Sequence, residues 1–126
     1  MPYLYTQCED IACRSVAPMQ DTPAIKITYN ATVKVKKEFV VHMSANQTSP
    51  PEAYGDDKLI YKFGCAIPIP SYLIAIAVGN LEETKMGKRT VVITEPEFMN
   101  ASVTALSSLE SLLDDAESYL TTYVWG

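Results

Sequence analysis

The 126-residue sequence is poor in the residues that usually build a catalytic or metal centre. It contains a single histidine, His42, and its three cysteines (Cys8, Cys13 and Cys65) form no C-x-x-C pair. An autonomous zinc site needs several such ligands at short spacings, so we expect none in this chain. We interpret His42, which lies in an apolar stretch, as a structural or surface side chain. The five glycines are isolated, so no glycine-rich phosphate loop is present either.

Positive charge and long apolar runs are also scarce. Ten lysines and arginines against fifteen acidic residues give a net charge of -5, which provides no electrostatic signature of binding to nucleic acid or to an anionic membrane. No apolar run reaches the ~18 residues of a membrane helix, and the N-terminus lacks the pattern of a signal peptide. The odd cysteine count is typical of reduced thiols. These features together predict a cytoplasmic protein.

What the sequence does contain is a series of short β-strand patterns. Residues 24–36 alternate strictly between apolar and polar side chains, which predicts a long strand with one buried face. Residues 38–43 favour the next antiparallel strand. Further strands are expected at 58–63, 72–78 (apolar on both faces and therefore central), 81–85 and 89–94. This spacing favours an antiparallel sheet or sandwich.

Two stretches are predicted to interrupt the strands. Residues 44–57 are polar and contain Pro50-Pro51 and Gly55, which indicates an exposed loop. Pro68 and Pro70 are expected to break any ladder that they enter, because proline has no N–H to donate.

The pattern changes to helical at Thr94. Thr94-Glu-Pro-Glu97 has the form of a capping box, and apolar residues then recur every three or four positions as far as Leu120. We expect one amphipathic helix of roughly 20 residues. Its carboxylates are expected on the solvent side; they are Glu110, Asp114, Asp115 and Glu117.

The opening stretch is the best candidate for a binding site. A short aromatic strand, Tyr3–Tyr5, runs directly into Gln7 and Glu9, which share a face if the strand continues. A carboxylate and an amide side by side could hold an ammonium group. A polar strand end in water would have the same spacing. Further on, Asp21 is a plausible turn residue whose side chain accepts from backbone N–H groups, and Arg14 could pair with it or face solvent.

Several segments, in order along essentially the whole chain, carry a resemblance to a known family. They are Tyr3-Leu-Tyr-Thr-Gln-Cys-Glu9, Cys13-Arg14, Pro18-x-x-Asp21-Thr22-Pro23, Ile60-Tyr-Lys-Phe63, Ile67-Pro-Ile-Pro-x-Tyr-Leu-Ile-Ala-x-x-Val-Gly79 and Tyr123-Val-Trp-Gly126. In these segments the chain resembles the zinc aminopeptidases of the leukotriene A4 hydrolase type.

The resemblance implies that Gln7, Cys8 and Glu9 contribute to a substrate pocket, where the position of Glu9 helps to bind the free α-amine of a peptide. The leukotriene A4 hydrolase branch usually has glutamine there, so Glu9 suggests aminopeptidase activity more than the handling of a fatty-acid epoxide. Asp10 replaces a usual alanine. The zinc and its general base belong to segments that are expected after residue 126. We therefore expect no catalytic residue in this chain.

The resemblance also implies a domain organisation. Residues 1–94 would be the later part of an N-terminal β domain, and 95–126 the first helix of a zinc catalytic domain that is otherwise absent. As such a piece, the chain would expose strand edges that favour self-association. The alternative is a stand-alone β-sandwich binding module with no catalysis.

Overall fold

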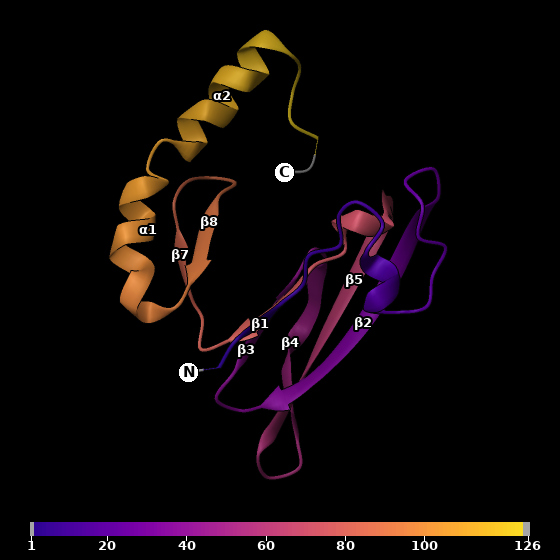
Figure 1. Cartoon of the computed structure of the whole chain (residues 1–126). Coiled ribbons are helices and arrows are strands. Elements are labelled where there is room, and N and C mark those ends of the chain that lie inside the picture. The colour runs from indigo at the N-terminus through magenta and orange to yellow at the C-terminus, as the bar shows by residue number, and fades with distance from the viewer. Residues whose placement is uncertain (1, 125–126) are drawn as a thin grey trace. The chain divides into compact units, whose positions relative to one another are not determined.

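The computed structural model describes residues 2–124, which divide between Asn80 and Leu81 into two compact units. The first unit contains six β-strands and the second contains a β-hairpin followed by helices (Figure 1). The prediction of a mainly antiparallel β chain with a C-terminal helical segment is confirmed.

The first unit is built from two three-stranded antiparallel sheets. One has the order β1-β6-β3, and the other has the order β2-β5-β4. The first sheet comprises β1 (Leu4–Tyr5), β6 (Ile76–Gly79) and β3 (Val40–Met43). The second comprises β2 (Lys26–Lys36), β5 (Lys58–Pro70) and β4 (Asn46–Tyr54). The long β2 strand lies along β5 in Figure 1.

The core of this unit lies between the two sheets. Its centre is formed by Val41 of β3 with Tyr61 and Phe63 of β5, and the apolar face of β2 packs against them. Along β2, partly buried and exposed residues alternate without interruption, which confirms the predicted strand and its buried face. Because Val33 lies opposite Tyr61 in the ladder, β2 and β5 present their apolar side chains on the same face.

Residues 38–43 contain the predicted antiparallel strand, β3, which pairs with β6 and not with the strand before it in the sequence. Two other predictions for this unit are wrong. Residues 44–57 were expected to form a loop, but β4 occupies most of them and pairs with β5. This strand is almost entirely exposed, so it lacks the apolar alternation that reveals a strand in a sequence. Its two prolines lie where the register shifts, between Ser49 and Glu52.

The second error concerns Pro68 and Pro70, which do not break the ladder. Strand β5 continues to Pro70, which lies opposite Lys26 of β2. The β4 ladder reaches only to Gly64, so beyond that point β5 pairs on one side alone. Proline is tolerated there because its ring nitrogen can face the open side. The central strand expected at 72–78 begins later, at Ile76, after a 3-10 turn, η2 (Ser71–Leu73).

The second unit contains the hairpin of β7 (Glu82–Lys85) and β8 (Val91–Thr94), followed by a 3-10 turn, η3 (Pro96–Phe98). Helices α1 (Met99–Ala105) and α2 (Leu109–Tyr119) complete it, and α1 packs on the hairpin (Figure 1). The predicted helix is therefore bent between Ala105 and Leu109. The capping box does not form: Thr94 belongs to β8, and no side chain caps η3 or α1.

Three of the four carboxylates expected on the solvent side of the helix belong to an ion-pair network, and two of these three are partly buried. Arg89 pairs with Glu110, Asp114 and Glu117 at distances of 3.3, 2.7 and 2.9 Å. The Thr90 hydroxyl also donates to Glu110, at 2.7 Å. Glu110 and Glu117 are only partly exposed as a result. None of the helices described here is both long and apolar enough to cross a membrane.

Candidate functional site

The predicted site lies where the chain leaves the first sheet. Leu4 and Tyr5 of β1 pair with Val78 and Ala77 of β6. Thr6 extends this contact, because its backbone N–H donates to the Ile76 carbonyl and its hydroxyl accepts from the Ile76 N–H, both at 3.1 Å. Regular pairing stops there. Gln7, Cys8 and Glu9 therefore follow a firmly anchored strand end.

Gln7 and Glu9 are both exposed and lie close together, although not as the alternation argument predicted. They are joined by a local hydrogen bond, in which the Glu9 backbone N–H donates to Gln7 Oε1 at 2.9 Å. The peptide bond after Glu9 is cis. Across the described residues, no lysine, arginine or histidine forms an ion pair with the Glu9 carboxylate. The segment thus presents an unneutralised carboxylate beside an amide.

Cys8 is placed differently from its two neighbours. It is buried together with Cys13, and the Ala12 backbone N–H donates to the Cys8 carbonyl at 3.0 Å to form a turn between them. Burial, and then the adjacent Cys8 thiol, raise the pKa of Cys13 to about 12. A thiol of such high pKa is a poor nucleophile. In this chain Cys8 and Cys13 are buried groups. The contact of Cys8 with a ligand stays a prediction, and the burial of Cys8 does not favour it.

A buried carboxylate fixes the chain that follows. Asp21 Oδ2 accepts from the Arg14 backbone N–H at 2.9 Å and from Arg14 Nε at 3.1 Å, and Asp21 Oδ1 accepts from the Ser71 hydroxyl. The Ser71 hydroxyl first, and then Arg14, hold the pKa of Asp21 below its ordinary value. Of the two roles that the sequence left open for Arg14, pairing with Asp21 is the one that the structure shows. Ser71 was missed, and the only signal for it was a hydroxyl between the prolines of β5 and an apolar run.

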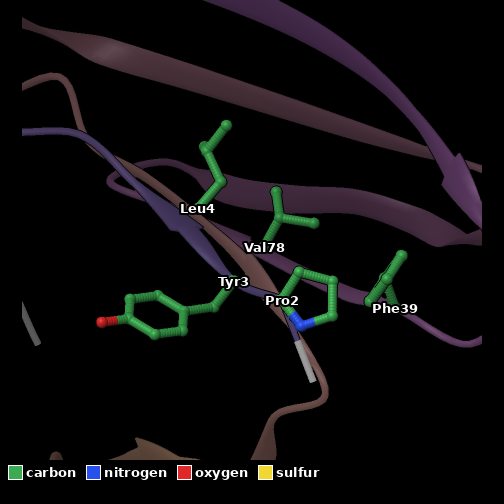
Figure 2. Close-up of a pocket in the computed structure, with 5 residues that line it drawn as sticks. All are labelled: Pro2, Tyr3, Leu4, Phe39 and Val78. Atoms are coloured by element: carbon green, nitrogen blue, oxygen red, sulfur yellow. The ribbon is translucent and has the colours of Figure 1, made fainter.

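The remaining candidates do not gather into a catalytic centre. His42 lies in β3 opposite Ala77 and is partly buried. Within residues 2–124, no three His, Cys, Asp or Glu side chains converge as a metal site requires. A groove of about 190 Å³ lies at the beginning of β1, lined by Pro2, Tyr3, Leu4, Phe39 and Val78 (Figure 2). Its lining is mainly apolar, and the hydroxyl of Tyr3 is the one polar side-chain group among these residues.

Comparison with known proteins identifies the family. A family model described as the peptidase M1 N-terminal domain matches residues 1–73, more than half of the chain. This chain belongs to the peptidase M1 family. Among curated members, it is 44% identical to leukotriene A-4 hydrolase of Xenopus laevis over 126 residues, which cover 99% of this chain and 21% of that protein. It is 38% identical to leucine aminopeptidase 2 of Chaetomium globosum over the same length, with 20% of that protein covered.

Solved structures from the same family have the same fold. Native yeast LTA4 hydrolase superimposes with a TM-score of 0.81 at 33% identity, and the match covers 99% of this chain and 19% of that one. The complex of yeast LTA4 hydrolase with bestatin matches equally well. The chain thus spans about a fifth of the length of these M1 relatives.

Proposed function

We propose that this chain is part of a zinc aminopeptidase that removes N-terminal residues from peptides, and that its Gln7–Glu9 segment forms one wall of the substrate pocket. Membership of the M1 family supports the proposal, as does similarity to relatives named hydrolase and aminopeptidase along the whole chain. Because the chain is about a fifth of their length, the activity is proposed for the whole protein and not for this piece.

The observation that carries the proposal is that Glu9 is exposed and forms no ion pair among the described residues, while its backbone N–H is bonded to the exposed Gln7 side chain. The free end of a peptide is an ammonium group, and charge-assisted hydrogen bonds to it are stronger than neutral ones. One lone pair of Gln7 Oε1 is used by the Glu9 N–H, which leaves a second available to accept from a ligand. Binding the terminal amine in this way positions the first peptide bond for cleavage.

The zinc that this family implies does not fit the residues described here. No group of three suitable ligands occurs among residues 2–124, so we assign no zinc ligand in this chain and derive no chemical step from it. The proposed contribution of this chain is limited to binding and orienting the substrate amine.

We further propose that Glu9 favours amine substrates over epoxides. A carboxylate adds a full negative charge where the resemblance leads us to expect a neutral glutamine. That charge stabilises a bound ammonium group through Coulomb attraction, whereas an uncharged epoxide gains nothing comparable.

The test uses the full-length protein and fluorogenic aminoacyl substrates. We expect chelator-sensitive release of the fluorophore, and a rise in KM of roughly tenfold or more for Glu9→Ala, as for loss of a hydrogen bond to a charged group. Glu38→Ala, which removes another exposed carboxylate, is the matched control and should leave KM unchanged. An unchanged KM in Glu9→Ala would contradict the proposed role. The isolated chain should release no fluorophore. Turnover by the isolated chain that survives a chelator would contradict the proposal that catalysis belongs to the whole protein.

A further inference from the structure

The buried Asp21 carboxylate links two segments that are far apart in the sequence. Its side chain is 1% exposed, whereas that of its partner Arg14 is 59% exposed, so the anion and not the cation is the buried member of the pair. Both carboxylate oxygens are used: one accepts twice from Arg14, and the other accepts from Ser71, fifty residues away. Arg14 Nη2 also donates to the Asp21 carbonyl at 2.8 Å.

These bonds hold the exit of the Gln7–Glu9 segment. After Glu9 the chain turns at Ala12 and enters a 3-10 turn, η1 (Cys13–Ser15), whose Arg14 backbone N–H is bound by Asp21. Cys13 is fully buried in the same turn, which restricts it further.

The entrance of the segment is held by the same part of the chain. Thr6 is bonded in both directions to Ile76, and Ile76 follows η2, whose first residue is Ser71. The two ends of the segment are therefore both attached to residues 71–78: the entrance through Thr6, and the exit through Arg14 and Asp21. If the Asp21–Ser71 contact were lost, the exit would keep no hydrogen bond to that stretch among the residues that the structure describes.

We propose that Asp21, through Ser71 and Arg14, is a positioning residue that fixes the Gln7–Glu9 pair for amine binding. This inference rests on the function proposed above. A carboxylate that is buried with three donors cannot shift without leaving those donors unpaired, and that cost keeps the turn in one arrangement. Preorganisation of this kind lets a ligand bind without the expense of ordering the loop. Asp21 itself touches no substrate in this account.

The experiment uses Ser71→Ala and Asp21→Asn, with Ser111→Ala and Asp57→Asn as matched controls. Ser111 donates to a local helix carbonyl, and Asp57 is an exposed turn residue, so each control removes the same chemical group at an unrelated place. Amide hydrogen exchange of residues 6–12 in this chain reports loop order directly. We expect exchange to be faster by roughly tenfold in Ser71→Ala, the change expected when a hydrogen bond to a charged group is lost, and unchanged in both controls.

A second measurement in the full-length protein separates positioning from general destabilisation. Ser71→Ala should raise KM for a free-amine substrate by about tenfold while kcat changes little. In a Glu9→Ala background the same change should add almost nothing, because the group it positions has gone. Asp21→Asn should behave in the same way where it folds, and Ser71→Ala carries the test if it does not.

The possible failures can be told apart. If Glu9→Ala leaves KM unchanged, the proposed function fails whatever Ser71 does. If Glu9→Ala raises KM but Ser71→Ala changes neither KM nor exchange of residues 6–12, the positioning role is overturned. Equal effects of Ser71→Ala with and without Glu9 would also overturn it, since they would reflect a structural role alone.

Discussion

The two units of this chain differ in the interactions that stabilise each of them internally. In the first, residues from both sheets bury an apolar core, and the hub of the polar contacts is a buried anion, Asp21. In the second, Val92 is the one buried apolar residue among those described, and the hub is a cation, Arg89, shared by three carboxylates. Apolar burial involves no titrating group, whereas a charge network is screened by salt and weakened when its carboxylates are protonated. The first unit is therefore suited to hold a rigid site, while the stability of the second should depend on salt and pH.

The largest expected effect comes from removing the core of the first unit. Phe63 is buried and packs beside Tyr61, so Phe63→Ala should lower the free energy of unfolding by about 3–5 kcal/mol. Urea denaturation followed by hydrogen exchange of β5 measures it. Ile60→Ala, on the other face of the same strand, should cost clearly less. Similar losses of unfolding free energy in both variants would contradict this account, because they would show that the first unit does not gain its stability from the apolar core.

A smaller effect is expected at the hub of the second unit. Arg89→Met keeps the aliphatic stem but removes the partner of Glu110, Asp114 and Glu117, and it also removes the cation over the Tyr123 ring. Hydrogen exchange in α2 should become faster by roughly tenfold, as expected when a partly buried charged network is lost.

Two neighbouring variants serve as controls for that experiment. Lys88→Met removes an adjacent exposed cation and should change little. Asp114→Asn removes the most exposed of the three carboxylates, and its effect should be about 0.5 kcal/mol or less, as for surface ion pairs. Unchanged exchange in Arg89→Met would contradict the role of the network.

The smallest expected effect is a difference between the two units in the pH at which they begin to lose stability in acid. The Thr90 hydroxyl holds the pKa of Glu110 below 4.5, the Tyr123 backbone N–H does the same for Glu117, and Arg89 adds to both. A carboxyl whose pKa is lowered by folding stabilises the folded state above its unfolded pKa, and this contribution is lost as pH falls through the folded pKa. The loss in the second unit should therefore begin near pH 4.5. For Asp21 it should begin lower, near 3.8.

Circular dichroism and hydrogen exchange can follow that difference. Both α-helices lie in the second unit, so ellipticity at 222 nm reports chiefly on it, while exchange of β5 reports on the first. The helical signal should decline at a higher pH than protection of β5. A simultaneous loss of both signals would show that the two units do not differ in this respect.

The regular parts of the fold could be predicted because local pattern and burial agree in them. The alternation of apolar and polar residues along β2 matches the alternation of its partly buried and exposed side chains. The hairpin of β7 and β8 is marked by its turn residues. Strand β4 could not be found in this way, since it is stabilised by backbone pairing with β5 while its side chains stay in water. Asp114 and Asp115 are exposed as predicted, but Glu110 and Glu117 are partly buried. Their partner, Arg89, comes from the hairpin turn more than twenty residues earlier, and no local pattern marks it.

The candidate site was predictable in its members but not in its arrangement. Gln7 and Glu9 stand out as polar residues after an aromatic strand, yet they meet through a backbone-to-amide bond and not on a shared strand face. The Asp21–Arg14 pair was one of two options that the residues left open, and Ser71 depends on a contact across fifty residues. Such long-range partners are set by how β5 returns past β2, which no local pattern encodes.

The most direct test of the central claim, that Glu9 binds the α-amine of a peptide, is a comparison of two inhibitory peptides that differ only in N-acetylation. Their inhibition constants would be measured on the full-length protein and on its Glu9→Gln variant. The wild type should prefer the free amine by roughly tenfold or more, and the preference should largely disappear in Glu9→Gln, because only the charge has been removed. An equal preference in both proteins would contradict the claim.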